Sequence, residues 1–281
     1  LNNTVTTDNS TVVTLTGTGS VQFDSDGNGT FGDATKTLVS GAFTISTKDN
    51  LAESITLTAT DDNAKIGSSS SIAVEAGAFA KLQLLMPGET TSPGSASGKT
   101  GTPTAQTVGT PLTVTVNAVD ANWNPISTND AVQITSSDTA AVLPANGPLS
   151  GGSGTFSVTF KTAGTQTVTA SNVTHVGIAP DTGTTTTVNV GDQTITFNSP
   201  GDQTYGVAPI TLDATASSGL AVSFSVVLGP ATVSGNQLTI TGVGSITIRA
   251  TQAGDANWNA ATPVNRTISV AQKTLTGNIT A

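Results

Sequence analysis

The sequence predicts an all-β fold built from several β-sandwiches in a row. The chain is rich in Thr, Gly, Ser and Asn, and charged residues make up only 10% of it. β-branched side chains fit a pleated strand better than a helix, and the strong helix formers Leu, Glu, Lys and Arg are scarce. A chain of 281 residues has room for two or three all-β modules of about 100 residues. We therefore expect almost no helix.

Short segments that alternate between apolar and polar residues recur along the whole chain, and Gly, Asn, Asp or Pro separates them. A period of two places one face of a strand in a core and the other in solvent, and many short strands at close spacing are typical of β-sandwiches. The expected strands are 20–23, 42–46, 54–60, 112–119, 154–160, 165–170, 185–190, 210–216, 222–227, 238–242 and 245–251.

An internal repeat divides the first two thirds of the chain. "NPISTNDAVQITSSD" at 124–138 resembles "NTVTTDNSTVVTLTG" at 3–17, and similar turn-rich and strand-rich stretches follow both. Repeats of this length indicate one structural unit each. We therefore expect related modules at 1–77 (module 1) and 78–191 (module 2).

A third sandwich is expected at 192–271 (module 3), where alternating segments are dense. Module 2 opens with an apolar-alternating strand at 112–119 that has no counterpart in module 1, so module 1 is expected to have an open apolar groove and free edges. Residues 272–281 begin a strand of a further module, or a strand that a neighbouring copy receives.

The composition excludes several functions. The formal net charge is −9 with only nine Lys and Arg, so we expect neither nucleic-acid binding by counterion release nor attraction to anionic membranes. No apolar run approaches the ~18 residues of a membrane span. One His and no Cys leave no His-based triad and no His- or Cys-rich zinc site. We therefore expect no enzyme, and His175 has no catalytic partner in the sequence.

Several stretches resemble bacterial Ig-like repeat domains of large secreted surface proteins and adhesins. The likeness is strongest in module 3, through "TYG", "VSFSV" and "QAGDANWNAA". It extends to module 2 through "LQLLMPGET" and to module 1 through "FDSDGNGTFGD", and "KTLTGNITA" (273–281) is similar to the first strand of a further module type. The resemblance implies Ig-like sandwiches in a stalk, fibre or adhesin at a bacterial surface. It implies no catalytic residue.

The stretch "DSDGNGTFGD" is the candidate metal site. Its spacing matches a calcium loop, with a Gly at position 6, although a Thr stands where the bidentate Glu of that loop belongs. The expected ligands are Asp24, Asp26, Asn28, the Thr30 carbonyl and Asp33. The alternative is a plain hairpin turn, because Asp-Gly and Asn-Gly are strong turn signals. A bound calcium would stiffen the module and perform no chemistry.

The pentapeptide DANWN occurs twice, at 120–124 and 255–259, and contains both tryptophans of the chain. The first interpretation is a pair of Asx-type turns whose Trp covers the end of a sandwich core. The alternative is that Trp123 and Trp258, together with Tyr205, stack on a sugar or another ligand.

The sequence therefore predicts a structural segment of a bacterial extracellular fibre, stalk or adhesin. Its partners are neighbouring repeats of one long chain, or other copies that add a strand through Lys273, Leu275 and Ile279 in a head-to-tail filament. The alternative is a module that binds surface glycans through exposed aromatics.

Two kinds of covalent modification are weaker possibilities. Lysines that could donate to an isopeptide cross-link are Lys36, Lys81, Lys161 and Lys273. N-glycosylation triplets occur at Asn9, Asn172 and Asn265, as expected by chance in a Thr-rich chain.

Overall fold

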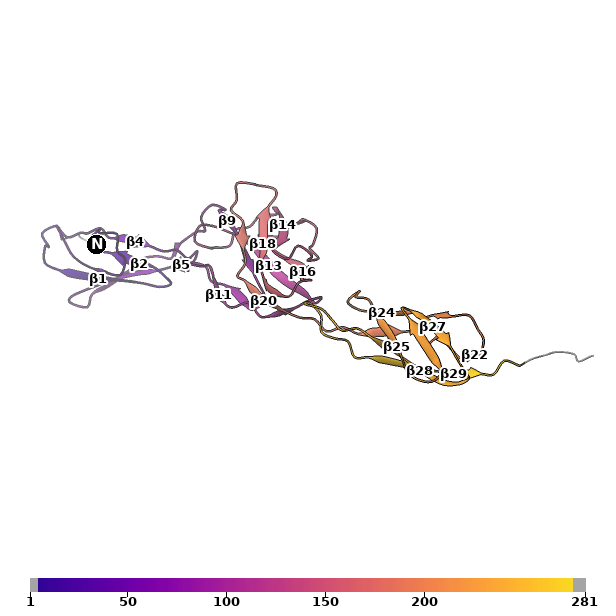
Figure 1. The fold of residues 1–281 in the computed structure, drawn as a ribbon. Helices are drawn as coiled ribbons and strands as arrows, with labels where there is room; N and C mark the ends of the chain where they lie inside the picture. Colours follow the sequence, from indigo (N-terminus) through magenta and orange to yellow (C-terminus); the bar gives the residue numbers. More distant parts are fainter. Residues whose placement is uncertain (1–4, 275–281) are drawn as a thin grey trace, which may run out of the picture.

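A computed structural model describes residues 5–274, and every regular element in that range is a β-strand. The predicted all-β class and tandem sandwich architecture are confirmed. Figure 1 shows three groups of strands that follow one another along an extended molecule. No helix in the described part is long and apolar enough to span a membrane.

Module 1 consists of one four-stranded sheet, of order β3-β1-β6-β7, and two strand pairs, β2-β4 and β5-β8. Its strands are β1 (Val12–Gly17), β2 (Gln22–Asp24), β3 (Thr35–Thr37), β4 (Ser46–Lys48), β5 (Ser54–Ile55), β6 (Leu57–Asp61), β7 (Ile66–Ser68) and β8 (Ile72–Ala73).

Module 2 packs the four-stranded sheet β15-β14-β18-β19 against the sheets β16-β13-β9 and β12-β20-β17, with a hairpin β10-β11 at the side. Its strands are β9 (Lys81–Leu85), β10 (Glu89–Thr91), β11 (Lys99–Gly101), β12 (Gln106–Thr107), β13 (Pro111–Val119), β14 (Ala131–Ser136), β15 (Gly147–Pro148), β16 (Ser153–Thr159), β17 (Gly164–Gln166), β18 (Val168–Asn172), β19 (Asp181–Thr182) and β20 (Thr186–Asn189).

Module 3 combines a four-stranded sheet, β22-β29-β28-β25, with β23-β27-β26 and the pair β21-β24. Its strands are β21 (Ile195–Phe197), β22 (Gln203–Thr204), β23 (Ile210–Thr211), β24 (Ala214–Ala216), β25 (Ser223–Leu228), β26 (Ala231–Ser234), β27 (Gln237–Ile240), β28 (Gly244–Thr251) and β29 (Val264–Ala271).

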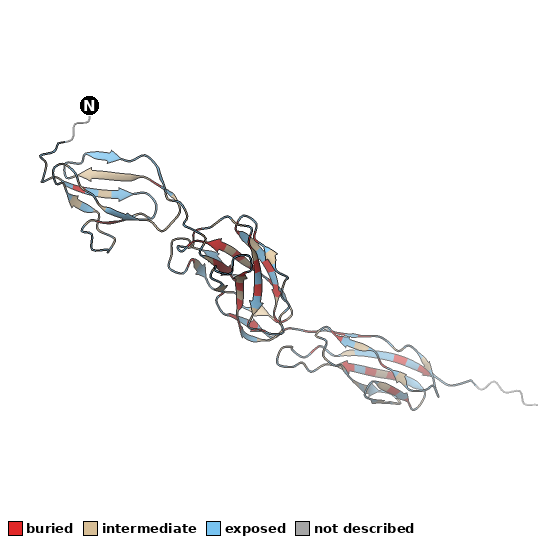
Figure 2. Ribbon diagram, turned by 90° about the horizontal axis from the view of Figure 1, so that it is seen from above, coloured by how far each residue is buried: buried red, intermediate tan, exposed pale blue. Residues whose placement is uncertain are grey.

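Two contiguous hydrophobic cores lie in modules 2 and 3. Leu82, Val116 and Phe160 have no exposed surface in module 2. In module 3, Phe197 and Leu238 are almost fully buried, and the ring centroids of Phe197 and Phe224 lie 5.4 Å apart. Inward side chains alternate with outward Thr and Ser along the strands, as Figure 2 shows by the banding of buried and exposed residues.

Module 1 has a much smaller interior. Within residues 5–73, the buried apolar side chains are Val13, Phe23 and Ile55. Its four-stranded sheet matches β15-β14-β18-β19 of module 2 in order and in antiparallel pairing. Residues 5–73 contain no strand that corresponds to β9 or β13 of module 2, which together bury much of the module 2 core. The small interior follows from that difference.

Four expected strands differ from the observed ones. The expected strand 54–60 divides into β5, which pairs with β8, and β6, which pairs with β1 and β7. The expected strand 165–170 divides into β17 and β18, because β17 pairs with β20 and β18 with β14. The expected strand 210–216 divides in the same way, since β23 pairs with β27 and β24 with β21. The expected strand 42–46 is wrong. In module 2 the corresponding segment forms the long strand β16, which pairs with β13. Module 1 has no counterpart of β13, and only the three-residue β4 forms there.

Candidate functional site

An acidic loop follows β2 in module 1. Asp24 is 4% exposed, and its two carboxylate oxygens accept the N–H groups of Gly27 (2.7 Å) and Gly29 (2.9 Å). Gly27 and Gly29 have φ of 76° and 84°, a conformation that favours glycine and lets the loop fold around the carboxylate. One carboxylate oxygen from each of Asp24, Asp26 and Asp33 lies within 4.8 Å of the other two. The structure thus brings three of the predicted ligands together.

Asn28, a fourth predicted ligand, and Asp33 have hydrogen-bond partners inside the loop. The Asn28 side chain is taken up within the loop: its Nδ2 donates to Asp26 (2.7 Å) and its Oδ1 accepts the Thr30 N–H (2.6 Å). Asp33 Oδ2 accepts from the Ser25 hydroxyl at 2.5 Å, and this hydrogen bond lowers the pKa of Asp33. Asp33 Oδ1 is buried and has no hydrogen-bond donor. A buried carboxylate oxygen without a donor fits a cation better than it fits a plain turn.

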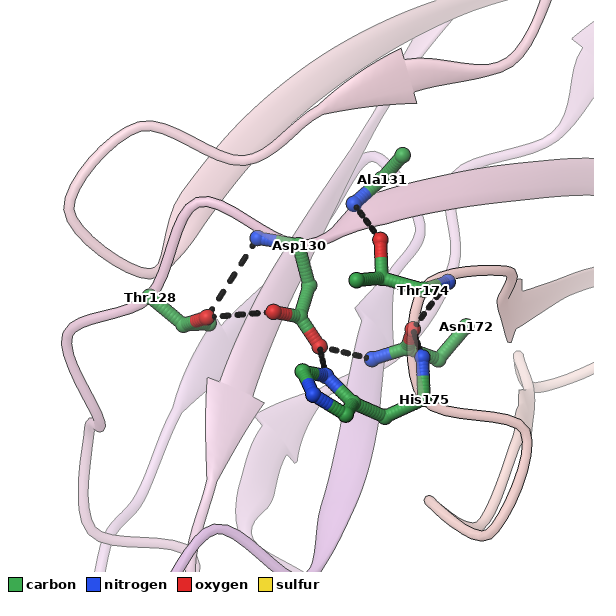
Figure 3. Close-up of polar contacts among 6 residues, drawn as sticks. All are labelled: Thr128, Asp130, Ala131, Asn172, Thr174 and His175. Atoms are coloured by element: carbon green, nitrogen blue, oxygen red, sulfur yellow. Dashed lines mark hydrogen bonds and ion pairs between the residues drawn. The ribbon is translucent and has the colours of Figure 1, made fainter.

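The only histidine belongs to a closed polar network in module 2, drawn in Figure 3. Asp130, 6% exposed, accepts hydrogen bonds of 2.7 Å from His175 Nδ1, Asn172 Nδ2 and Thr128 Oγ1. The bond from His175, followed by those from Asn172 and Thr128, lowers the pKa of Asp130 to about 2. Asn172 Oδ1 in turn accepts the backbone N–H of His175 at 2.8 Å. These contacts tie the loop after β18 to the start of β14, which is a structural role.

The first DANWN copy forms a turn at the end of module 2 that faces module 1. Asp120, 3% exposed, accepts the backbone N–H groups of Asn122 (2.8 Å) and Asn124 (2.9 Å) through Oδ1. Its Oδ2 accepts the Asn124 side-chain amide at 3.0 Å and the N–H of Gly77, in the linker, at 2.8 Å. The Asp120 carboxylate therefore closes the turn and also holds the linker between the two modules.

Asn124 crosses the junction between modules 1 and 2. Its Oδ1 accepts the Ala52 N–H and its Nδ2 donates to the Asn50 carbonyl, both at 2.9 Å. Trp123 stays within module 2: its Nε1 donates to the Ala96 carbonyl at 3.3 Å, and its ring packs on Gly98. Both modules thus share one amide side chain that is 2% exposed.

Lys81 Nζ lies 3.4 Å from the centroid of the Trp123 ring and donates to the Ala121 carbonyl at 2.9 Å. This cation–π contact and the packing on Gly98 occupy the Trp123 ring within the module.

The second DANWN copy lies at the end of module 3 that faces module 2. Asp255 Oδ1 closes the turn by accepting the N–H groups of Asn257 (2.8 Å) and Trp258 (2.9 Å). Asn257 Oδ1 accepts the N–H of Ala163 in module 2 at 2.9 Å, and its backbone carbonyl accepts the Gly191 N–H at 2.9 Å. The Trp258 ring packs against the core of module 2 and over Gly109, where a Cβ would lie 2.5 Å from the ring.

Both pentapeptides therefore bind the preceding module, although they occupy different loops of their own modules. Each uses its Asp to close a turn and one Asn side chain to accept a backbone N–H from the preceding module. The sequence showed the turns but not their location, because the first copy follows β13 and the second follows β28, and only the fold shows that both loops face the preceding module.

The remaining predicted residues lie apart from these sites. Tyr205 is 43% exposed at the far end of module 3, and Lys273 is exposed beyond β29. Leu275 and Ile279 lie outside the described residues. Lys36 Nζ donates to the Ser25 carbonyl.

The three glycosylation triplets differ in their surroundings. Asn172 is 6% exposed, so its amide is not accessible to a glycan-transferring enzyme. Asn9 Oδ1 accepts the Ser40 N–H at 2.7 Å, and Asn265 Oδ1 accepts from Arg249 at 3.1 Å on the surface.

No family model matches the chain, and no curated protein matches its sequence. Among solved structures, it is similar to the D00-D0 domain of intimin (16% identity, TM-score 0.32, covering 65% of this chain and 93% of that one). It is also similar to a C-terminal intimin fragment solved with the intimin-binding domain of its translocated receptor (15%, TM-score 0.26, 69% and 64%). A third match is domains 1–6 of the surface layer protein SbsC (16%, TM-score 0.27, 95% and 36%). The chain spans less than two thirds of the last two structures.

Proposed function

We propose that this chain is a structural spacer segment of a bacterial extracellular fibre, stalk or adhesin. The observation that supports it is the pair of junctions, each tied by a turn that closes on an Asp and by an Asn side chain that binds the preceding module. Modules that were only strung together on linkers would move freely, and inter-domain motion is the default without such contacts. A spacer needs the opposite property, because it must hold its ends apart.

The site chemistry agrees with this role. The Asp130–His175 pair is consumed by a structural network, and the polar groups of both junctions are directed at backbone groups of the chain itself. We infer a location at the cell surface or outside the cell from this role and from the resemblance to bacterial Ig-like repeats.

Small-angle X-ray scattering tests the spacer role directly. We expect an elongated particle whose maximum dimension corresponds to three modules in line and whose flexibility analysis indicates one rigid body. A scattering curve that requires an ensemble of bent shapes would contradict a spacer function. Variants of both Asn residues, Asn124→Ala and Asn257→Ala, should broaden the distribution of dimensions, whereas Asn122→Ala, in the same turn but without a side-chain bond to module 1, should not.

We further propose that the acidic loop of module 1 binds calcium. Three carboxylates converge there, and the buried Asp33 Oδ1 lacks a donor. Calcium takes oxygen ligands, so Asp24, Asp26 and Asp33 supply carboxylates, and the Thr30 carbonyl and water complete the coordination sphere. A bound ion would add stability to the module with the smallest core, in proportion to its binding free energy.

The calcium proposal is tested by thermal unfolding with and without millimolar calcium. We expect the lowest transition to rise with calcium in the parent chain. Asp33→Asn should remove the rise, and the control Asp62→Asn, an exposed Asp in module 1 outside the loop, should retain it. Isothermal titration that detects no calcium heat with the parent chain would refute the site.

Two other functions remain predictions. Head-to-tail strand addition through Lys273, Leu275 and Ile279 would appear as concentration-dependent filaments in negative-stain electron microscopy, and a monomer at every concentration would refute it. Glycan stacking is favoured at Tyr205, because the Trp123 and Trp258 rings already have protein contacts. Unchanged intrinsic fluorescence on addition of polysaccharides would count against it.

A further inference from the structure

The face of module 2 that receives module 3 is defined by three elements. The parallel pair of β12 and β20 leads into Gly109, and the loop before β17 presents the Ala163 N–H. The linker at Gly191 completes the face. Trp258 covers Gly109 and Gly191, and Asn257 accepts from Ala163. Val108, beside Gly109, is left only 2% exposed.

Module 3 builds the same face at its opposite end. Its parallel pair of β22 and β29 aligns Gln203 with Val270, as β12 and β20 align Gln106 with Val188. The antiparallel neighbours of β29 and β20 also begin in the same register: Gly244 of β28 lies opposite Val270, and Gly164 of β17 lies opposite Val188.

The conformations of the glycines agree as well. Gly206 has φ of 89° and its counterpart Gly109 has φ of 80°, while Gly244 and its counterpart Gly164 have φ of 121° and 115°. The Tyr205 N–H donates to the Ala271 carbonyl at 2.8 Å, as the Val108 N–H donates to Asn189 at 2.9 Å.

Nothing in the described part of the chain covers this face in module 3. Tyr205, the counterpart of Val108, is 43% exposed, Val207 is 41% exposed, and Val243, the counterpart of Ala163, is 51% exposed. A Cβ at Gly206 would meet nothing within 4 Å, whereas a Cβ at Gly109 would collide with a Trp ring. Three large apolar side chains that gather on one face with open space beside a glycine indicate a binding surface.

We propose that this end of module 3 is a docking surface for the aromatic-tipped Asx-turn loop of another sandwich module, of the kind formed by 255–259. The occupant follows from the fold, since the matching face of module 2 holds that loop. In the docked state the loop's ring covers Gly206 and Tyr205, and its Asn side chain accepts the Val243 N–H, which has no acceptor in the described part of the chain. This inference rests on the proposed spacer role, because a spacer extends by repeating one junction.

One difference limits how the ring can lie. Lys273 occupies the position of Gly191, where a Cβ would come 2.7 Å from the Trp ring. The docked ring must therefore lie toward Gly206 and away from the linker, with the Lys273 stem along its edge.

The test is a chain lengthened by its own third module, in which Lys273 is joined to a second copy of 192–281, so that Lys273 stays at the position that Gly191 holds in module 2. Amide hydrogen exchange is read at Val243 of the original module, with Ala163 as the internal standard for a protected junction amide. We expect exchange at Val243 to slow about tenfold or more relative to the unextended chain. Asn257→Ala in the appended copy alone should restore the fast exchange.

A second variant separates docking from folding. Val243→Asp in the original module changes a side chain that is 51% exposed, so the unextended chain should keep its stability. In the lengthened chain the docked ring should also slow exchange at the Gly206 amide, and Val243→Asp should abolish that slowing. Unchanged exchange at residues 203–207 and 243 in the lengthened chain, with Ala163 still protected, would overturn the inference. The scattering of the unextended chain tests the spacer role separately, so the two failures are distinguishable.

Discussion

Replacement of Asn124 by Ala tests the idea that side-chain bonds hold the modules in line. Asn124 is 2% exposed, and its side chain makes one bond within module 2, to Asp120, and two bonds to module 1, at Asn50 and Ala52. Each hydrogen bond contributes about 1 kcal/mol net, and a buried partner left unpaired costs about 1–3 kcal/mol. Since solvent can enter the junction, we take the lower values and expect a loss of about 2–4 kcal/mol in total.

About two thirds of that loss should appear as lost coupling between the modules, because two of the three bonds cross the junction. Urea unfolding gives the total, and amide exchange at Ala52 gives the junction share, with an expected acceleration of about tenfold to a hundredfold.

The matched control is Asn122→Ala. This residue lies in the same turn and takes part through its backbone: its N–H donates to Asp120 and its carbonyl accepts from Gly94. Asn122→Ala should therefore leave both measurements within about 0.5 kcal/mol of the parent. If Asn124→Ala and Asn122→Ala were equal in stability and in Ala52 exchange, the junction bonds would contribute nothing and the reasoning would be refuted.

Three further substitutions have defined outcomes. Trp258→Ala should lower the free energy of unfolding by about 2–3 kcal/mol in urea titrations, below the range for a fully buried Trp because the ring is partly exposed; no change would contradict its packing on module 2. Asp130 has its pKa lowered to about 2, so its contribution is complete above the ordinary value of 3.8 and is lost as the pH falls toward 2; Asp130→Asn should flatten the acid-unfolding curve in that window. Gly152→Ala places a Cβ 1.9 Å from the Ile126 carbonyl oxygen and should cost about 1–3 kcal/mol, whereas Gly151→Ala, with open space around it, should cost less than half as much in the same titration.

The fold class could be predicted from the sequence because the alternation of apolar and polar residues that defines a strand is a local pattern. Alternation along 112–119 and 245–251 matches β13 and β28 closely, since each strand has one face in a core. The divided strands at 54–60, 165–170 and 210–216 could not be predicted, because the alternation continues across the point where the chain leaves one sheet for another. Only the identity of the pairing strand reveals such a switch.

The candidate sites were predictable to different degrees. Loop spacing placed Asp24, Asp26 and Asp33 together, because Asp-Gly and Asn-Gly turns fold a short segment back on itself. The inward turn of the Asn28 amide depends on a local Asx bond that competes with any ion and that spacing does not reveal. The junction role of DANWN depends on which end of a sandwich each loop occupies, and this is a property of topology and not of the pentapeptide.

The linker at Gly191 has a consequence for how the molecule carries tension. Its N–H donates to Asn257 and its carbonyl accepts from Asn259, so the connection between modules 2 and 3 is hydrogen-bonded to the next module on both sides of one residue. A pulling force must break these two bonds before the linker can lengthen. Module 1, whose described residues include three buried apolar side chains, has far less to resist the same force. Extension should therefore begin in module 1 and spare the Gly191 connection, which makes the chain a rod with one compliant end.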